Sequence, residues 1–304
     1  MSTALTAFAD EVGPDGPVAV EGGLTRWDAA GPLDDGVRVL RAPVGLVEYQ
    51  PAEMTVRVLA GTTVADLHDE LASAGQRTAL PDRGGTVGGA VVVGENAPTM
   101  LGVGRIREAV LQVTYVSADG RLVVGGGPTV KNVSGFDLPR LFVGSFGTLG
   151  LVGEVILRTN PVPAASVWLA ADDADPAAVF DTLLRPGAIF HDGARTTVLL
   201  EGHAVDVEHQ TEQLRSMGTF LPADGPPALP EHRWSVAPSE LRRLDTSTTG
   251  EYVAAIGVGL LWAARRQPRR APEPSASEVA RRIKAEFDPT RRLNPGRFVA
   301  GMEH

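Results

Sequence analysis

The chain has 304 residues, 43% of them hydrophobic, which is enough to fill two domains or one large body with an insertion. With 37 acidic and 28 basic side chains its net charge is −9, which argues against nucleic acid or an anionic membrane as the main partner. It contains no cysteine, which excludes disulfides, thiolate catalysis, iron–sulfur ligation and a thiol-linked flavin.

The start of the chain and its apolar runs predict neither a leader nor an anchor. In residues 1–11 no positively charged stretch precedes an apolar one, as it would in a signal peptide. The longest apolar run, 252–264, is interrupted by Gly257 and Gly259 and is shorter than the roughly 18 residues of a membrane span. We therefore expect no transmembrane segment and a cytoplasmic protein, peripheral to the inner face of the membrane at most through partners.

The first 160 residues predict short strands with one or two helices. The hairpin signal Ala118-Asp119-Gly120 separates two of the strands. Residues 63–74 predict an amphipathic helix that Thr63 begins and Gly75 ends. From β-branched content and length we expect strands at 37–40, 54–59, 110–116, 121–124 and 151–158.

Three glycine-rich segments interrupt this half, each beside a strand-like run. They are 21–27 after Val18-Ala19-Val20, 83–90 before Val91-Val92-Val93, and 125–150 before the strand at 151. Glycines leave backbone N–H groups uncovered and able to approach an anionic or planar ligand. Any one alone is more often a tight turn, but three together favour a single extended ligand. Neither of the first two fits a P-loop or a Rossmann fingerprint.

The pattern of predicted elements changes after residue 161. We expect a helix from Asp175-Pro176 to about 184, a strand at 196–200, a second helix at 204–217, a proline-rich loop at 221–232 and a buried strand at 252–262. This order predicts a small α+β cap over an antiparallel sheet. Residues 265–274 predict a linker, either a solvated loop or a docking segment, and Ser275 with Glu278 begins a closing helix to 287.

Together these segments resemble the FAD-binding domain of the vanillyl-alcohol oxidase (PCMH-type) superfamily, and within it the FAD-binding subunit of bacterial glycolate oxidase. The resemblance covers roughly residues 15–160 and 280–300. Its specific part is Lys131-Asn132-Val133-Ser134-Gly135 followed by Gly147-Thr148-Leu149-Gly150. The other matching pieces, in the family's order, are the glycine turn at 22–25, the run 51–58 before Ala60-Gly61-Thr62, the turn 86–89, and the tail 287–297 with Leu293-Asn294-Pro295-Gly296-Arg297.

The resemblance implies an α+β fold in three parts. A PCMH-type FAD-binding domain of two subdomains would span residues 1–162. A small α+β cap domain over an antiparallel sheet would span 163–284, and the C-terminal tail 285–304 would return to the FAD site.

The resemblance also implies where FAD binds. The first two glycine turns would hold the pyrophosphate through backbone N–H groups, the third would line the adenine end, and the tail would approach the flavin. The residues so implied are Gly22, Gly23, Leu24, Thr25, Thr86, Gly88 and Gly89 for the pyrophosphate, Gly147, Thr148, Leu149, Gly150, Leu151 and Val152 for the adenine end, and Asn294 for the flavin.

The sequence departs from the family in two features near this site. Glu21 and Leu24 interrupt a run that usually has three glycines before threonine, and a carboxylate beside a pyrophosphate is unfavourable unless it points away. Phe136 stands where the family usually has tyrosine. The nearest histidine in sequence, His68, lies mid-helix among acids and predicts a solvated residue, so we expect non-covalent FAD.

Hydroxy-acid oxidation needs a base for the hydroxyl proton and a cation for the carboxylate. His191, His203, Arg195 and Arg233 of the cap region can serve, but no motif selects them, so the catalytic residues stay unassigned. His203 and His209 are six residues apart, which does not place them on one helix face. We therefore predict no metal site.

The resemblance implies an FAD-dependent oxidoreductase that works as the FAD-binding subunit of a 2-hydroxy-acid (glycolate- or D-lactate-type) dehydrogenase complex. Its flavin would accept a hydride from the small 2-hydroxy-acid substrate and pass electrons to a partner. The implied partners are a larger FAD-containing catalytic subunit and an iron–sulfur subunit. The alternative is a non-catalytic scaffold or electron-relay subunit that retains the FAD-binding fold. The short cap favours a chain that depends on partners.

Overall fold

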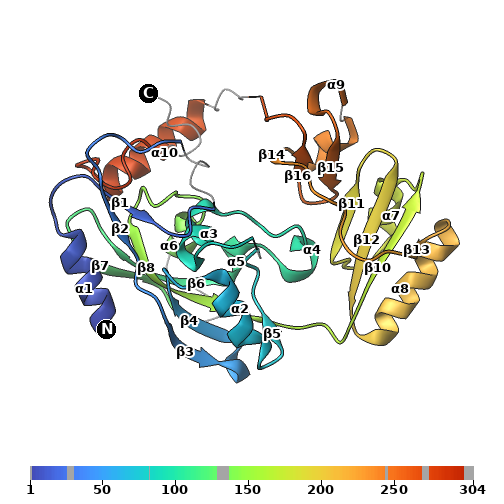
Figure 1. The fold of residues 1–304 in the computed structure, drawn as a ribbon, viewed down its shortest axis with the longest axis horizontal. Helices are drawn as coiled ribbons and strands as arrows, with labels where there is room; N and C mark the ends of the chain where they lie inside the picture. The colour runs from blue at the N-terminus through green and yellow to red at the C-terminus, as the bar shows by residue number, and fades with distance from the viewer. Residues whose placement is uncertain are drawn as a thin grey trace. The chain divides into compact units, whose positions relative to one another are not determined.

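The computed structural model describes residues 2–25, 31–81, 83–128, 137–243, 246–268 and 274–297. The chain folds into two units (Figure 1). The large unit comprises residues 1–97, 105–161 and 271–304, and the small unit comprises 98–104 and 162–270. The units differ from the expected division in two places. The closing helix belongs to the large unit, and residues 98–104 belong to the small one.

The large unit begins with a helix and a parallel strand pair, continues into an antiparallel sheet, and ends with a long helix. Its helices are α1 (Thr3–Val12), η2 (Pro51–Glu53), α2 (Val64–Ala72), α3 (Val87–Val93), α5 (Ile106–Ala109), α6 (Leu138–Phe142) and α10 (Pro274–Phe287). Its strands are β1 (Val18–Glu21), β2 (Arg38–Arg41), β3 (Leu46–Gln50), β4 (Thr55–Leu59), β5 (Gln76–Arg77), β6 (Val110–Val116), β7 (Leu122–Gly126), β8 (Leu151–Arg158) and β9 (Asn160–Pro161).

A five-stranded antiparallel sheet in the order β3-β4-β8-β6-β7 forms the centre of the large unit. β8 is the central strand, and seven of its eight residues are buried. Its apolar sequence is typical of a strand that is covered on both faces. β1 and β2 form a separate parallel pair, and Leu293 of the tail forms a parallel bridge to Val18 of β1. The C-terminal segment therefore lies beside the N-terminal strand.

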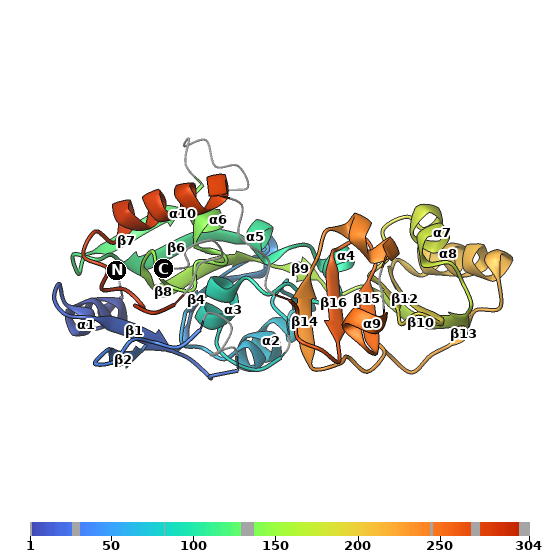
Figure 2. The same cartoon turned by 90° about the horizontal axis from the view of Figure 1, so that it is seen from above.

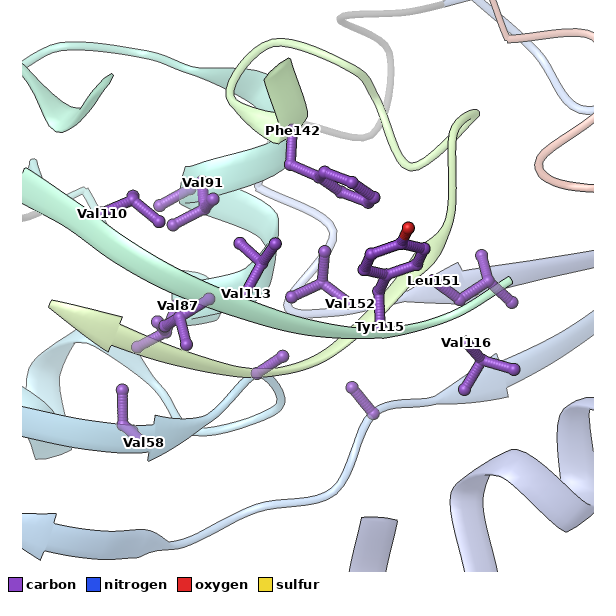
Figure 3. Close-up of a cluster of buried hydrophobic side chains, with 14 of the residues drawn as sticks. Val58, Val87, Val91, Val110, Val113, Tyr115, Val116, Phe142, Leu151 and Val152 are labelled. Carbon is purple, nitrogen blue, oxygen red and sulfur yellow. The ribbon is translucent and has the colours of Figure 1, made fainter. Parts of the chain in front are cut away.

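The core of the large unit lies between this sheet and helices α2, α3 and α6. Figure 3 shows Val87 and Val91 of α3 pointing toward Val113 of β6 within one buried cluster. The Phe142 ring packs on the Tyr115 ring with centroids 4.3 Å apart. α10 lies beside α6 (Figure 2), and its Phe287 meets Phe142 edge-on at 6.3 Å. Burial of this surface is the main force that holds the layers together.

The small unit is an antiparallel sheet with two main helices on one face. Its seven strands follow the order β13-β10-β12-β11-β15-β16-β14. The strands are β10 (Ala165–Asp172), β11 (Ala188–His191), β12 (Arg195–Gly202), β13 (Leu221–Pro222), β14 (His232–Ser235), β15 (Tyr252–Ala255) and β16 (Leu260–Ala263). The helices are α4 (Met100–Val103), α7 (Pro176–Thr182), α8 (Ala204–Met217), η3 (Pro238–Arg243) and α9 (Thr246–Thr249).

The two faces of this sheet carry different side chains. On one face, Val179 of α7 and Val207 and Leu214 of α8 pack against strands β10 to β12 (Figure 2). The other face is aromatic, because Phe190 lies between Trp168 and Trp262 with ring centroids 6.1 and 6.5 Å away. The expected α+β class, with a small α+β unit built on an antiparallel sheet, is confirmed.

Two expected elements are wrong. The strand-like run at 91–93 belongs to helix α3, which Thr86 caps through its Oγ1 and which ends at Gly94 with φ +70°. Burial of Val87 and Val91 on one helical face overrides the strand preference of valine. The single strand expected at 252–262 is a hairpin of β15 and β16, because Gly257 (φ +81°) and Gly259 (φ +73°) reverse the chain.

Candidate functional site

A pocket in the large unit gathers six segments that are distant in sequence. They are the end of β1 with the turn after it, the residue after β2, the residues after β4, helix α3 with its cap, the turn before β8 with the start of that strand, and the tail after α10. The described lining residues are Val20, Glu21, Gly22, Gly23, Leu24, Thr25, Ala42, Ala60, Gly61, Thr86, Gly88, Gly89, Val92, Val93, Phe146, Gly147, Leu151, Val152, Asn294 and Arg297. The wall is mostly apolar side chains and glycine backbone, with a few polar groups at fixed positions.

Most residues expected at the FAD site lie on this wall. The exceptions, Thr148, Leu149 and Gly150, belong to the third glycine turn but are not lining residues. The Thr148 side chain is buried and donates to Ser145 O at 2.7 Å. Gly150 fits against the aromatic pair of the core, because a Cβ there would lie 2.3 Å from Cδ2 of Tyr115. These three residues support the turn from behind the pocket wall.

The turn after β1 presents backbone donors to the pocket. The N–H groups of Gly22, Gly23 and Leu24 have no hydrogen-bond acceptor among the residues that the structure describes. Gly23 lies against the second glycine turn, because a Cβ at Gly23 would be 2.8 Å from Cα of Gly85. Successive unpaired N–H groups of this kind form an anion-binding concavity.

The second turn is the N-terminus of α3. Thr86 Oγ1 accepts the N–H of Gly89 at 3.2 Å, and Gly88 donates its N–H to Ala60 O at 2.8 Å. A Cβ on Gly88 would lie 2.8 Å from Cβ of Ala60, so this glycine is required for packing. Gly89 meets only Thr86 Oγ1, at 3.1 Å, and its remaining side is open to the pocket. Gly89 is thus the position of the two at which an added side chain would reach a ligand.

The tail closes the pocket through the Asn294 amide. Its Oδ1 accepts the N–H of Val20 at 3.3 Å, and its Nδ2 donates to Phe146 O at 3.0 Å. One side chain therefore joins the end of β1 to the turn before β8. Gly147 makes room for this contact, since a Cβ there would lie 2.3 Å from Asn294 Nδ2.

Three of the seven described non-glycine residues with a left-handed backbone lie on the same wall. Leu24 (φ +59°), Phe146 (φ +52°) and Asn294 (φ +46°) are left-handed, and all three line the pocket. Bulky residues such as leucine and phenylalanine rarely adopt this conformation. Residues held in sparsely populated conformations cluster at functional sites, where the surrounding structure imposes them.

The charged groups on the pocket wall have partners. The Glu21 carboxylate accepts two hydrogen bonds from Arg41, at 3.2 Å from Nε and 3.0 Å from Nη2. Glu21 was the feature of the sequence least compatible with a pyrophosphate, and its carboxylate is held by an arginine side chain that is itself 76% exposed. Arg297, also on the wall, donates to the carbonyl of Gly31.

Sequence reasoning did not single out several lining residues. Arg297 and Phe146 lie within quoted motifs, and the left-handed conformation of Phe146 leaves no signal in the sequence. The apolar wall residues Val20, Ala42, Ala60, Val92 and Val93 appear only once the segments are brought together. The motif residues Lys131 to Gly135, and Phe136, lie outside the described residues.

The histidine closest in sequence to the glycine turns is not on the pocket wall. His68 is half-buried, and its Nε2 lies 3.1 Å from Thr78 Oγ1. This contact differs from the fully solvated position that its acidic neighbours predicted.

The polar residues considered for catalysis lie in the small unit and have local partners there. Arg195 pairs with Asp172 at 2.7 Å, and His191 Nδ1 lies 3.1 Å from Thr196 Oγ1. Burial lowers the pKa of His191 below its ordinary value. Arg233 lies in β14, and His203 and His209 lie at the start and middle of α8.

Within the described ranges, no three histidine, aspartate or glutamate side chains gather as a metal site would require. Among the described helices, none is long and apolar enough to cross a membrane.

Comparison with known proteins relates the first part of this chain to FAD-binding proteins. Residues 10–126 match the family model described as an FAD binding domain. The chain is 32% identical over 157 residues to glycolate oxidase subunit GlcE of Escherichia coli, a match covering 50% of this chain and 45% of that protein. It is 32% identical over 164 residues to a D-lactate dehydrogenase of Archaeoglobus fulgidus, covering 52% of this chain and 36% of that protein. The chain thus spans less than half the length of these two relatives.

A solved structure shares the fold across both units. An alkyldihydroxyacetonephosphate synthase aligns with a TM-score of 0.68 and 14% identity over 94% of this chain and 72% of that chain. At this identity the likeness concerns the fold alone. The matched relatives include an uncharacterized FAD-linked oxidoreductase of Mycobacterium tuberculosis, 35% identical over 151 residues that cover 48% of this chain and 32% of that protein. Residues 10–126 therefore match an FAD binding domain, and the relatives that share about half of this chain bear the names of an oxidase subunit, a dehydrogenase and an FAD-linked oxidoreductase.

Proposed function

We propose that the pocket of the large unit binds one FAD non-covalently. The observation that carries this proposal is the row of N–H groups at Gly22, Gly23 and Leu24, which have no acceptor among the described residues and belong to residues that line the pocket. These groups would hold the pyrophosphate, with Thr86 and Gly89 on its other side. Backbone N–H groups that point the same way can bind a phosphate group without a positively charged side chain.

The remaining expected residues have consistent places in this proposal. Gly147, Leu151 and Val152 would form the adenine end, with Thr148 and Gly150 holding the turn from behind. Asn294 would approach the flavin from the tail. The residues present fit the group, because the donors, the apolar wall and the paired Glu21 lie in one pocket.

We further propose that the chain is the FAD-binding subunit of a 2-hydroxy-acid dehydrogenase of the glycolate or D-lactate type. FAD, when bound, supplies the two-electron acceptor for that oxidation. Relatives bearing the names glycolate oxidase subunit and D-lactate dehydrogenase support this substrate class. Since the chain has no cysteine, an iron–sulfur cluster that carries electrons onward would have to belong to a partner. A larger FAD-containing subunit and an iron–sulfur subunit are the proposed partners, in the cytoplasm or at the inner face of the membrane.

A second function is favoured by the composition of the pocket. No histidine, aspartate or lysine is among its described lining residues, and the Glu21 carboxylate, which is among them, is paired with Arg41, so the described wall offers no unpaired base for a hydroxyl proton. The chain would then be a scaffold or electron-relay subunit that binds FAD without oxidising substrate.

The visible spectrum of the purified chain tests FAD binding, and a dye-linked assay separates the two functions. We expect a yellow protein that releases all its flavin into the supernatant on acid or heat treatment. A colourless chain that takes up no added FAD would contradict the binding proposal, and flavin that stays with the precipitate would contradict only the non-covalent part. The isolated flavin-loaded chain is expected to show little turnover of glycolate or D-lactate. Turnover near 10 per second, an ordinary enzymatic rate, would reject dependence on partners.

A further inference from the structure

Lys284, in the last turn of α10, joins two parts of the large unit that both reach the pocket. Its Nζ donates to Thr148 O at 2.7 Å and to Leu293 O at 3.2 Å. Thr148 follows Gly147 in the third glycine turn, and Leu293 precedes Asn294 in the tail. Both of these neighbours line the pocket, but Lys284 does not.

The lysine is held in this position by a buried carboxylate. Asp288 is fully buried, and its Oδ2 accepts from Lys284 Nζ at 2.5 Å and from the N–H of Leu293 at 2.8 Å. Its Oδ1 accepts the N–H of Arg292 at 3.0 Å. The carboxylate therefore both neutralises the ammonium and folds residues 288–293 into the turn that brings the tail back. A side-chain charge that is only 18% exposed needs such a partner.

The contacts of Lys284 and Asn294 connect the same two segments. Lys284 donates to the carbonyls of both Thr148 and Leu293. Asn294, the residue after Leu293, donates from Nδ2 to Phe146 O at 3.0 Å. If the lysine bridge is lost, the hydrogen bond of the Asn294 amide is the one that still ties the tail to the glycine turn among the described residues. Asn294 itself has a left-handed backbone, with φ +46°, so its position depends on how the residues around it hold the tail.

We propose that Lys284 is a positioning residue for the cofactor pocket, which fixes Asn294 between β1 and the Phe146–Gly147 turn without touching the cofactor. This inference rests on the proposed assignment of FAD to the pocket. It predicts that loss of Lys284 weakens FAD binding more than a general loss of stability explains.

The experiment compares Lys284→Met with a matched structural variant, Arg38→Met. Arg38 lies outside the pocket and donates at 2.9 Å to Val12 O at the end of α1. FAD affinity is measured by quenching of flavin fluorescence on the apo-protein, well below the melting temperature of each variant. Loss of a charged hydrogen-bond donor corresponds to a change in Kd of about tenfold to a hundredfold, which we expect for Lys284→Met. Arg38→Met is expected to lower the melting temperature of the apo-protein and leave Kd unchanged.

A double variant tests whether the lysine acts through Asn294. If it does, Lys284→Met combined with Asn294→Ala binds FAD no more weakly than the weaker of the two single variants. Fully additive losses would overturn the proposal, as would a Kd for Lys284→Met equal to that of the parent chain. Should Lys284→Met not fold, Lys284→Gln keeps a neutral donor and is expected to give an intermediate Kd. An unchanged Kd in the folded Lys284→Gln protein would also overturn the proposal. A parent chain that binds no FAD would contradict the pocket assignment instead.

Discussion

The two units use their polar side chains over very different distances along the chain. In the large unit, Lys284 reaches a carbonyl 136 residues away and Arg292 one 280 residues away. In the small unit, Arg195 pairs with Asp172 over 23 residues and His191 with Thr196 over five. The pocket of the large unit thus depends on a few long-range contacts that hold loops together. In the small unit, the side-chain pairs of Arg195 and His191 lie within neighbouring strands, so changes to these side chains in the two units should have different consequences.

The largest expected effect comes from removing the most connected buried cation. Arg292 is 4% exposed and donates to four backbone carbonyls, those of Val12, Asp15, Gly16 and Ala118. Arg292→Met leaves these acceptors without their donor, so we expect a loss of about 3 kcal/mol and a melting temperature lower by roughly 10 °C. Calorimetry of the apo-protein measures this shift.

The matched control for Arg292 is an arginine of the small unit. Arg195 and Asp172 are 45% and 72% exposed at their side chains, so their ion pair contributes little in water. Arg195→Met is expected to change the melting temperature by about 1 °C or less. Equal decreases in melting temperature for the two arginine variants would contradict the comparison, because they would show that long-range and local contacts stabilise the protein equally.

A smaller effect is expected from an added side chain on the pocket wall. Gly89→Val places a branched side chain where only Thr86 Oγ1 lies nearby and where the phosphate would approach. We expect at least about a hundredfold rise in the Kd for FAD, close to 2.7 kcal/mol, with the fold retained. Equilibrium titration of the apo-protein with FAD gives the value.

The control for Gly89 lies in the small unit. Gly218 has an extended backbone, and a Cβ there would meet nothing within 4 Å. Gly218→Val should leave both the Kd and the fold unchanged. Unaltered flavin affinity in Gly89→Val would show that the second glycine turn serves packing alone.

The same contrast explains which parts of the molecule the sequence could predict. The strands at 110–116 and 151–158 and the helix at 204–217 were expected with the bounds that the structure has. Their residue patterns are local and strongly periodic. Helix α3 and the β15–β16 hairpin were not expected. Burial of one helical face determines α3, and positive φ angles at two glycines determine the hairpin.

The pocket divides in a similar way. Glycine turns are legible in the sequence because each is contiguous, and this was enough to indicate an extended ligand. The pairing of Glu21 with Arg41 and the bridge of Lys284 between Thr148 and Leu293 join residues with no shared motif. Only the folded chain brings such partners together. The sequence therefore shows a negative charge at Glu21 next to the expected pyrophosphate, but not its pairing with Arg41.

The smallest expected effect is a pH dependence in the small unit. Thr196 Oγ1 donates to Ala174 O at 2.6 Å, so it accepts from His191, and this assigns the proton of the neutral ring to Nδ1. Burial lowers the pKa of His191 in the folded state. As pH falls below about 6.5, the unfolded chain therefore binds a proton before the folded chain does, and stability decreases.

Three of the four tryptophans, Trp168, Trp234 and Trp262, lie in the small unit, so tryptophan fluorescence follows its unfolding. Between pH 7.5 and 5.5 we expect the melting temperature of the parent chain to fall by about 1–2 °C more than that of His191→Gln. Parallel pH profiles for the two proteins would mean that His191 contributes nothing to the acid sensitivity of this unit.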